Sequence, residues 1–380
     1  MYHQPKPHFL FLSPTFVSRI SSTRLFQQRL LTQQGGKLVP NNFRGIHVGK
    51  GGTRQTSIQA SARPTVVLCP GQGAQYVGMG KLWIEKCLSA KELFEEADDL
   101  LSSSFSLSIS ELCCDGSKDV LDRTDVAQPA IFLISYISWI SSQEMKLVVR
   151  ENISLSALAG LSLGEYTALV LGGAMLWQDA LRLVQIRGKA MQEASERTKG
   201  GMVALMGCTE EQAWECCSAV RQDQVLIPAN FNSPGQVVLS GHLEACQRAI
   251  EYATSKMQLK ATPLSVAGAF HSPLMESASN TLSKALEQVE IVPPKYPVLC
   301  NVTGSPHVES PSMIRQRLSE QLTSPVRWAD CMKYIEKHFP DEQDWLELAP
   351  GKTLAGLLRR INRKWRVSSL DEIGNATVMK

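Results

Sequence analysis

The pentapeptide Gly160-Leu161-Ser162-Leu163-Gly164 places a serine between two glycines, in the pattern Gly-x-Ser-x-Gly. The small and apolar run 153–159 predicts a buried strand before it. The segment after it begins with Glu165 and predicts a helix, because carboxylates stabilise a first helical turn. A strand, this turn and a helix form a nucleophile elbow, which exposes the serine hydroxyl at a helix N-terminus. The free N–H groups there favour developing negative charge, so the pattern predicts nucleophilic chemistry at Ser162.

A serine nucleophile needs a base within hydrogen-bond reach, and four histidines follow residue 63. His242 opens a predicted helix, where capping explains it, His307 lies in a loop after a proline, and His338 closes a predicted surface helix. His271 lies among small residues between a predicted strand and a predicted helix, where its ring can approach a neighbour. We therefore predict His271 as the base, with an ordinary surface histidine as the alternative interpretation.

Charge is distributed unevenly along the 380 residues. Residues 1–63 hold nine basic side chains and no Asp or Glu, whereas residues 64–380 hold 30 Lys and Arg against 36 Asp and Glu. The first segment has the composition of an organellar transit peptide, and its residues 16–31 can form a basic amphipathic helix. It favours the mitochondrial matrix over a plastid, and a disordered basic tail is the plainer interpretation. The mildly acidic remainder argues against a nucleic-acid-binding protein.

Other features argue against several classes of protein. No apolar run approaches the ~20 residues of a membrane-spanning helix, so we expect no membrane span. The ten cysteines show neither Cys-x-x-Cys spacing nor alternation with histidine, which predicts free core thiols and no metal site. The glycine-rich loop 71–73 matches neither the dinucleotide-binding pattern nor a Walker A sequence, so we reject a nucleotide site.

The predicted elements describe two interleaved parts. Strands at 65–69, 153–159, 297–301 and 345–348 alternate with helices near 80–101, 126–147, 177–195, 310–321 and 329–337. Between them, a β-α-β-β-α-β series predicts a ferredoxin-like unit, with its elements at 202–206, 209–220, 225–230, 236–240, 243–257 and 262–266. We therefore predict an α/β-hydrolase-like catalytic domain with an inserted subdomain. The predicted bounds are 1–63 for a transit or disordered segment, 64–197 and 268–370 for the catalytic domain, 198–267 for the subdomain and 371–380 for a tail.

Six segments occur in an order typical of one family: Gly71–Gln75, Gly160–Tyr166, Arg187–Ala194, Asn232–Gln236, Gly268–Ser272 and Ser324–Trp328. Together they resemble the malonyl-CoA:acyl carrier protein transacylases, the acyltransferases of type II fatty-acid synthesis. The resemblance covers about residues 64–365. It implies transfer of malonyl from malonyl-CoA to the phosphopantetheine thiol of acyl carrier protein, through an ester on the serine.

The resemblance also implies roles at the reacting centre. Ser162 would attack the thioester, and His271 would take the serine proton and later activate the incoming thiol. The backbone N–H groups of Gln72 and Leu163 would form the oxyanion hole. No metal or bound cofactor is implied, since phosphopantetheine arrives on CoA and on the carrier protein.

Three further residues complete the implied site. Arg187, 25 residues after Ser162, would pair with the malonyl carboxylate through two hydrogen bonds, a geometry that lysine cannot reproduce. Instead of a triad acid, the resemblance implies a backbone carbonyl that orients the histidine, and Gln321 is the matching position. Asn301 matches another asparagine near the site. An exposed helical glutamine is the alternative interpretation of Gln321.

The choice of acyl group is implied by the residue before the histidine. Phe270 holds the position where phenylalanine accompanies malonyl selection in related domains and serine accompanies methylmalonyl, because a bulky ring would crowd a branched chain. The chain departs from many relatives at two positions. Leu161 replaces a histidine before the nucleophile, and Gly268 replaces a histidine in the selectivity motif.

Three functions compete on the sequence alone. A monomeric transferase that binds malonyl-CoA and acyl carrier protein accounts for all six segments. A serine hydrolase, such as a lipase or thioesterase, could use the same elbow, but it would not need Arg187, and His271 has no evident acidic partner. A catalytically silent scaffold for a carrier protein would predict a lost nucleophile, base or arginine, whereas all three positions are filled.

Overall fold

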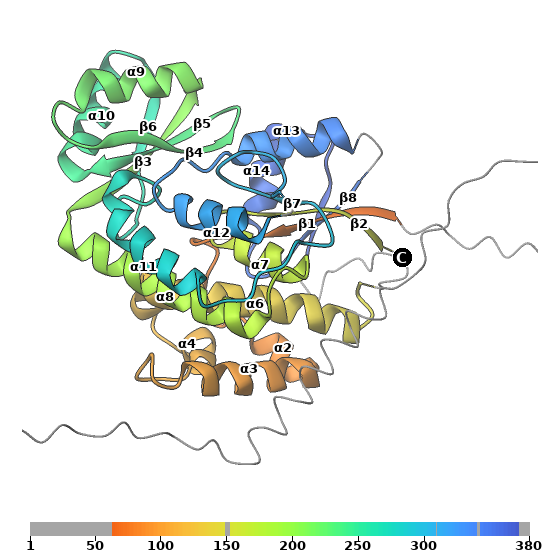
Figure 1. Ribbon diagram of the computed structural model, residues 1–380. Coiled ribbons are helices and arrows are strands. Elements are labelled where there is room, and N and C mark those ends of the chain that lie inside the picture. The colour runs from red at the N-terminus through yellow and green to blue at the C-terminus, as the bar shows by residue number, and fades with distance from the viewer. Residues whose placement is uncertain (1–62, 149–152, 309, 340–342, 372–380) are drawn as a thin grey trace, which may run out of the picture. The chain divides into compact units, whose positions relative to one another are not determined.

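Two separate β-sheets organise the protein in the computed structural model, which describes residues 63–148, 153–308, 310–339 and 343–371 (Figure 1). The predicted transit segment therefore lies outside the described residues, except for Arg63, and so does the predicted tail, except for Asp371. Among the described residues, no helix has both the length and the apolar character to cross a membrane.

The larger sheet is parallel and has the strand order β7–β2–β1–β8–β9. Its strands are β1 (Arg63–Cys69), β2 (Ile153–Gly160), β7 (Val298–Leu299), β8 (Asp344–Glu347) and β9 (Val367–Ser369). Side chains alternate between its faces, so Val67 and Cys69 enter one apolar core while Val66 and Leu68 enter another. Parallel sheets are buried on both faces, which explains the continuous apolar character of β1.

Helices cover both faces of this sheet (Figure 1). One face packs against α6 (Thr124–Glu144), α7 (Gly164–Leu171) and α8 (Trp177–Arg197), and the other packs against α13 (Trp328–His338) and α14 (Thr353–Ile361). The remaining helices are α2 (Lys81–Lys86), α3 (Leu88–Leu101), α4 (Ile109–Cys114), α5 (Lys118–Leu121), the short 3-10 helix η2 (Pro273–Met275), α11 (Glu276–Leu286) and α12 (Pro311–Glu320).

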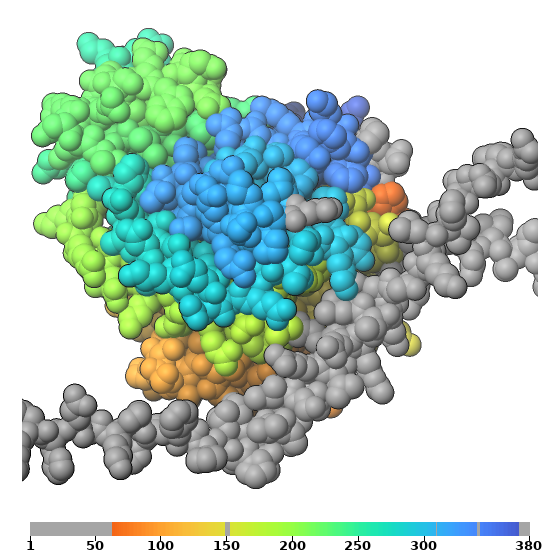
Figure 2. Space-filling view, viewed as in Figure 1, coloured from red at the N-terminus to blue at the C-terminus, as the bar shows by residue number. Residues whose placement is uncertain are grey.

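The second sheet is antiparallel, with the order β4–β5–β3–β6. Its elements follow the chain as β3 (Gly200–Cys208), α9 (Glu210–Val220), β4 (Leu226–Ser233), β5 (Gly235–His242), α10 (Leu243–Ser255) and β6 (Lys260–Pro263). This connectivity and strand order are those of a ferredoxin-like unit, and the unit forms a lobe of its own in the space-filling view (Figure 2). The predicted α/β class with an inserted ferredoxin-like unit is confirmed.

Several element bounds were predicted wrongly. The strand expected at 262–266 is β6 at Lys260–Pro263, because its pairing with β3 ends at Pro263. The single helix expected at 80–101 is two helices, because Cys87 between them has an extended backbone. No strand was expected at β9, whose three residues follow a basic segment and pair with β8.

Candidate active site

The nucleophile elbow joins β2 to α7 at the carboxyl end of the parallel sheet. Ser162 has a φ of +54°, the left-handed region that a tight turn requires and that side chains rarely adopt. The flanking glycines leave no room for a side chain. A Cβ on Gly160 would lie 1.9 Å from the carbonyl carbon of Gly164, and a Cβ on Gly164 would lie 2.1 Å from the carbonyl oxygen of Cys69. The elbow is therefore held by backbone packed directly against backbone.

His271 lies beside Ser162 although 109 residues separate them in sequence. The Ser162 hydroxyl lies 2.8 Å from His271 Nε2, and His271 Nδ1 lies 2.8 Å from the backbone carbonyl oxygen of Gln321. A carbonyl oxygen only accepts, so Nδ1 carries the proton and Nε2 is left to accept from the serine. This tautomer makes His271 a base toward Ser162, with a carbonyl in the place of a triad acid.

Arg187 reaches the same hydroxyl from α8. One of its terminal nitrogens donates to Ser162 Oγ at 3.0 Å and to the side-chain oxygen of Gln321 at 2.8 Å, and the other donates to Gln128 Oε1 at 2.6 Å. The Tyr166 ring lies 5.6 Å from the guanidinium carbon, at a cation–π distance. The guanidinium is buried, and its acceptors are neutral oxygens. A buried cation of this kind provides a site for a carboxylate close to the serine.

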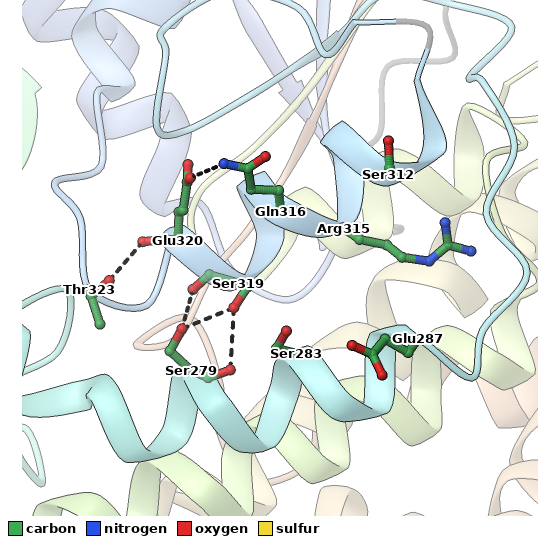
Figure 3. A pocket seen from close by; sticks show the side chains of 9 residues that line it. All are labelled: Ser279, Ser283, Glu287, Ser312, Arg315, Gln316, Ser319, Glu320 and Thr323. Carbon is green, nitrogen blue, oxygen red and sulfur yellow. Dashed lines mark hydrogen bonds between the residues drawn. The ribbon is translucent and has the colours of Figure 1, made fainter.

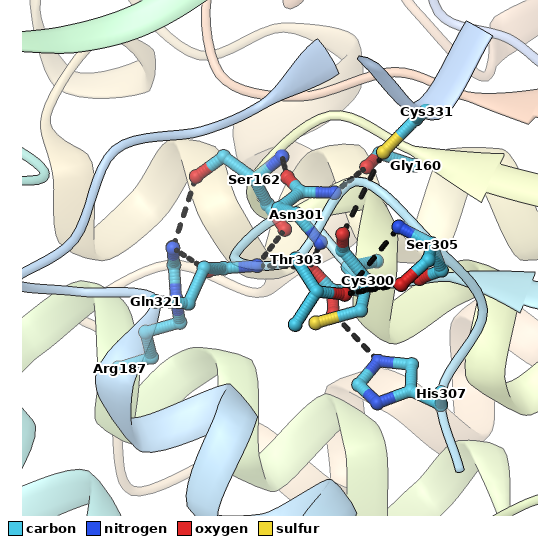
Figure 4. A network of polar contacts seen from close by, with 11 residues as sticks. Gly160, Ser162, Arg187, Cys300, Asn301, Thr303, Ser305, His307, Gln321 and Cys331 are labelled. Carbon is cyan, nitrogen blue, oxygen red and sulfur yellow. Dashed lines mark hydrogen bonds and ion pairs between the residues drawn. The ribbon is translucent and has the colours of Figure 1, made fainter. Parts of the chain in front are cut away.

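The side chains of Asn301 and Gln321 form hydrogen bonds with the backbone of the elbow (Figure 4). Asn301 Oδ1 accepts from the Ser162 backbone N–H at 2.6 Å, and its Nδ2 donates to the Gly160 carbonyl oxygen at 2.7 Å. The Gln321 amide nitrogen donates to the Ser162 carbonyl oxygen at 3.0 Å. Both side chains are fully buried, so the exposed-helix interpretation of Gln321 is wrong.

The glycine loop after β1 approaches the elbow closely. A Cβ on Gly71 would lie 2.3 Å from the carbonyl oxygen of Leu161. Neither the Gln72 N–H nor the Leu163 N–H donates a hydrogen bond to another described residue. Two free backbone N–H groups next to a nucleophile can donate to an oxygen on which negative charge develops.

Comparisons with known proteins agree with this geometry. The model of the acyl transferase domain family matches residues 66–368. A Bacillus subtilis malonyl CoA-acyl carrier protein transacylase is 38% identical over 296 residues, which cover 77% of this chain and 70% of the relative. The chain belongs to the malonyl CoA-acyl carrier protein transacylase family.

Solved structures of transacylases share the fold. The transacylase from Coxiella burnetii superimposes with a TM-score of 0.76 at 33% identity, covering 82% of this chain and 95% of that one. A malonyl-transacylase in complex with its type II PKS acyl-carrier protein gives the same TM-score at 34% identity, covering 82% and 97%.

Three polar residues of this transacylase-family site were missed by the sequence analysis. Glu165 was interpreted only as a first-turn carboxylate, but it is fully buried behind the elbow. His307 was dismissed as a loop histidine, but its Nε2 lies 2.6 Å from Glu165 Oε1 and its side chain is buried. Gln128, which accepts from Arg187, lies inside the apolar helix α6. A carboxylate directly before the apolar run 166–171 was a signal, because a buried charge needs partners.

Two departures from the transacylase pattern have visible consequences. A Cβ on Gly268 would lie 2.1 Å from Ser195 Oγ, so the histidine common at this position would not fit without displacing Ser195. Leu161 packs against the apolar core under α13 and α14, where the histidine of relatives would bring a polar ring. Phe270 is buried in the core shared by α6, α7 and α8, directly before the base.

Burial controls the electrostatics of the site. Burial is the largest effect on His271, the positive charge of Arg187 adds to it, and together they lower the pKa of the imidazole to about 4. Burial also lowers the pKa of Arg187, although Tyr166 and Glu165 partly oppose this effect. His271 is therefore neutral at physiological pH, as a base must be.

Two other features of this transacylase-family chain do not contribute a binding site. Glu165, Cys300 and His307 are near enough to hold an ion among the described residues, but the 2.6 Å hydrogen bond between Glu165 and His307 leaves no space between them. A groove of about 420 Å³ between α11 and α12 holds none of the predicted site residues (Figure 3). Its arginine, Arg315, already donates to the backbone carbonyls of Leu286 and Val289.

Proposed function

We propose that this protein transfers malonyl from malonyl-CoA to the phosphopantetheine thiol of acyl carrier protein, supplying units for chain extension. The observation that supports this most strongly is the position of the buried Arg187 guanidinium. It lies 3.0 Å from the Ser162 hydroxyl, which in turn is hydrogen-bonded to His271 Nε2. An acyl chain that ends in a carboxylate matches a fixed cation at this distance. Acyl groups without a carboxylate would leave that cation buried without an anionic partner.

In the first half-reaction, His271 Nε2 takes the Ser162 proton as Oγ attacks the thioester carbonyl carbon. Negative charge develops on the carbonyl oxygen, which the N–H groups of Gln72 and Leu163 stabilise. The carbon–sulfur bond then breaks, the proton on His271 passes to the sulfur, and CoA leaves as the free thiol. Malonyl remains as an ester on Ser162.

The second half-reaction reverses the roles. His271 takes the proton of the phosphopantetheine thiol, and the thiolate attacks the ester carbonyl carbon. The carbon–oxygen bond breaks, and the proton returns from His271 to Ser162 Oγ. These steps need no metal or bound cofactor, because the pantetheine arms bring the sulfur.

Arg187 binds the malonyl carboxylate during both steps. Its nitrogens now donate to Ser162, Gln321 and Gln128, so the carboxylate takes over donors that neutral oxygens hold in the free protein. The exchange favours the carboxylate because hydrogen bonds between charged groups are stronger than those to neutral acceptors. Phe270, directly before the base, limits the acyl group to an unbranched one.

Intact-mass spectrometry tests the proposal. Residues 64–380 are mixed briefly with malonyl-CoA and then with acyl carrier protein, beside the variants Ser162→Ala and Arg187→Ala. We expect a malonyl adduct on the wild type that the carrier protein discharges, no adduct on Ser162→Ala and a weakened one on Arg187→Ala. Free malonate without an adduct would instead support the serine hydrolase that uses the same pair. Neither adduct nor malonate would overturn Ser162 as the malonyl acceptor.

We further propose that the protein acts as a monomer in the mitochondrial matrix, with a plastid as the alternative. The composition of residues 1–63, which carry nine basic side chains and no acidic ones, supports an organellar address. A fluorescent fusion of the full chain and one lacking residues 1–63 test the location. Cytosolic fluorescence of the full chain would contradict it, and light scattering of the purified protein tests the oligomeric state.

A further inference from the structure

Glu165 is a fully buried carboxylate that does not touch the reacting atoms. Three donors surround it. His307 Nε2 lies 2.6 Å from Oε1, and Oε2 accepts from the Gln321 amide nitrogen at 2.6 Å and from the Asn301 backbone N–H at 3.1 Å. Both carboxylate oxygens of Glu165 therefore face hydrogen-bond donors. The side chain is a buried acceptor whose position is fixed from three directions.

This acceptor determines which way the Gln321 amide points. The amide nitrogen faces two acceptors, Glu165 Oε2 and the Ser162 carbonyl oxygen, and the amide oxygen faces a donor, Arg187. A flipped amide would point its oxygen at a carboxylate and its N–H groups at a guanidinium. Because both contacts would then be repulsive, only the observed orientation satisfies the network.

Gln321 also keeps two buried charges apart. Arg187 donates to its oxygen and Glu165 accepts from its nitrogen, so a neutral amide bridges the cation and the anion. If Glu165 touched Arg187 directly, the two would pair and the guanidinium would lose its attraction for a substrate carboxylate. The bridge balances the charge of Arg187 without occupying it with an anion.

His307 holds Glu165 from the opposite side. Its ring comes from the loop after β7, where its backbone N–H donates to the Val298 carbonyl oxygen at 2.9 Å. The ring is the hydrogen-bond partner of Oε1. Without it, one oxygen of a buried carboxylate would lose its donor, and the carboxylate would move toward another donor. A displaced Glu165 would no longer select the orientation of the Gln321 amide.

We propose that the Glu165–His307 pair is a positioning device that orients the Gln321 amide, and through it Arg187, so that the site favours acyl groups that carry a carboxylate. The inference rests on the proposed transfer of malonyl. Glu165 and His307 are positioning residues, since they act through Gln321. Their loss should impair recognition of the carboxylate more than the reactivity of Ser162.

The test compares two reactions of the same serine. Malonyl adduct formation needs both the Ser162–His271 pair and Arg187. An uncharged fluorophosphonate needs only the activated serine, which it phosphonylates as the phosphorus–fluorine bond breaks and hydrogen fluoride is released. The initial rate of each reaction is measured by intact mass for the wild type and for His307→Leu, His307→Gln and Arg187→Ala.

We expect His307→Leu to form the malonyl adduct about tenfold more slowly, the factor for losing one hydrogen bond to a charged group. Its fluorophosphonate rate should stay within about twofold of the wild type. His307→Gln should restore the malonyl rate, because its amide nitrogen can occupy the place of Nε2. Arg187→Ala removes the cation itself and so gives the malonyl rate expected when recognition of the carboxylate is lost.

Other outcomes overturn the inference. If both reactions slow equally in His307→Leu, the pair has only a structural role, and if neither slows, it has none in recognition. Should His307→Leu fail to fold, the isosteric Glu165→Gln, whose amide can face Gln321 either way, carries the same expectation. Failure of the proposed function looks different, since the wild type would then react with the fluorophosphonate but not with malonyl-CoA.

Discussion

The two sheets differ in the kind of polar side chain that they bury. At the elbow, the buried charged or titratable side chains of Glu165, Arg187 and His271 all have hydrogen-bond partners. The core of the ferredoxin-like unit is built from Ala, Cys, Val and Leu with one Phe, and its buried hydroxyls on Ser233 and Ser240 have no partner among the described residues. Buried charges are costly unless paired, whereas a lone hydroxyl costs much less. The elbow is therefore an interdependent network, and the antiparallel sheet is an ordinary apolar core.

This difference predicts how far a small change spreads. In the network each group positions the next, from Glu165 to Gln321 and from there to Arg187 and His271. In the antiparallel sheet, side chains contact flexible apolar neighbours that can adjust. The same substitution should then have different consequences in the two regions.

Adding one methyl group provides the largest contrast. Gly160→Ala places a Cβ 1.9 Å from the Gly164 carbonyl carbon, so the backbone of the elbow must move. Gly201→Ala in β3 places a Cβ 3.3 Å from the end of the Leu243 side chain, which is half exposed and can turn away. We expect Gly160→Ala to form the malonyl adduct at least about 100-fold more slowly than the wild type, and Gly201→Ala to form it at the wild-type rate.

Thermal unfolding shows how much each of these two glycine variants loses in stability as well as in activity. Gly160→Ala should lower the free energy of unfolding by about 1–3 kcal/mol or more, the range for forced overpacking, and Gly201→Ala by less than about 1 kcal/mol. Equal losses of activity in the two variants would contradict the claim that the elbow is the more constrained region.

The pH dependence of acylation tests how strongly burial and Arg187 affect His271 within the network. His271 has a pKa of about 4, lowered from 6.5 first by burial and then by Arg187. The neutral base therefore persists in acid, and the malonyl adduct rate should stay constant from pH 7 to about 5 and fall near pH 4. In Arg187→Ala, removal of the positive charge should move the inflection to higher pH. Single-turnover rates across this range measure both, and an inflection near 6.5 in the wild type would contradict the low pKa.

The lowered pKa of His271 also makes the free energy of unfolding depend on pH. The unfolded histidine, with a pKa near 6.5, binds a proton more readily than the folded one, so protons favour unfolding between pH 6.5 and 4. The contribution of His271 is complete above pH 6.5 and is lost as the pH falls through that window. Chemical unfolding of the wild type and His271→Asn at several pH values isolates it.

Local rules predicted most of the fold. The helix predicted at 209–220 is α9, and it begins where the Thr209 side chain accepts from the Gln212 N–H in a capping box. The hairpin between β4 and β5 follows from its Pro-Gly turn. By contrast, β9 has three residues and exists because β8 offers an edge. Pairing of this kind depends on distant residues, which a local pattern does not contain.

The site was predictable only in part, for a related reason. The elbow around Ser162 is a local pattern, but its partner His271 is 109 residues away. The small residues around His271 made it a candidate, and the family resemblance assigned it as the base. Gln128 lies in an apolar helix and His307 in a loop, where neither neighbourhood indicates a role. Their function is apparent only from the buried charges that they contact, Arg187 and Glu165.

The smallest expected effect is a difference in the free energy of unfolding between substitutions of two buried serines. Ser135 in α6 donates to the Ala349 carbonyl oxygen at 2.7 Å, whereas the Ser240 hydroxyl in β5 has no partner among the described residues. Ser135→Ala should lower the free energy of unfolding by about 1 kcal/mol, because the carbonyl loses its donor. Ser240→Ala should leave it unchanged or raise it by up to about 1 kcal/mol, because the variant no longer buries an unpaired hydroxyl. Urea unfolding of both variants measures the difference, and a larger loss at Ser240 would show that the antiparallel sheet also depends on its polar groups.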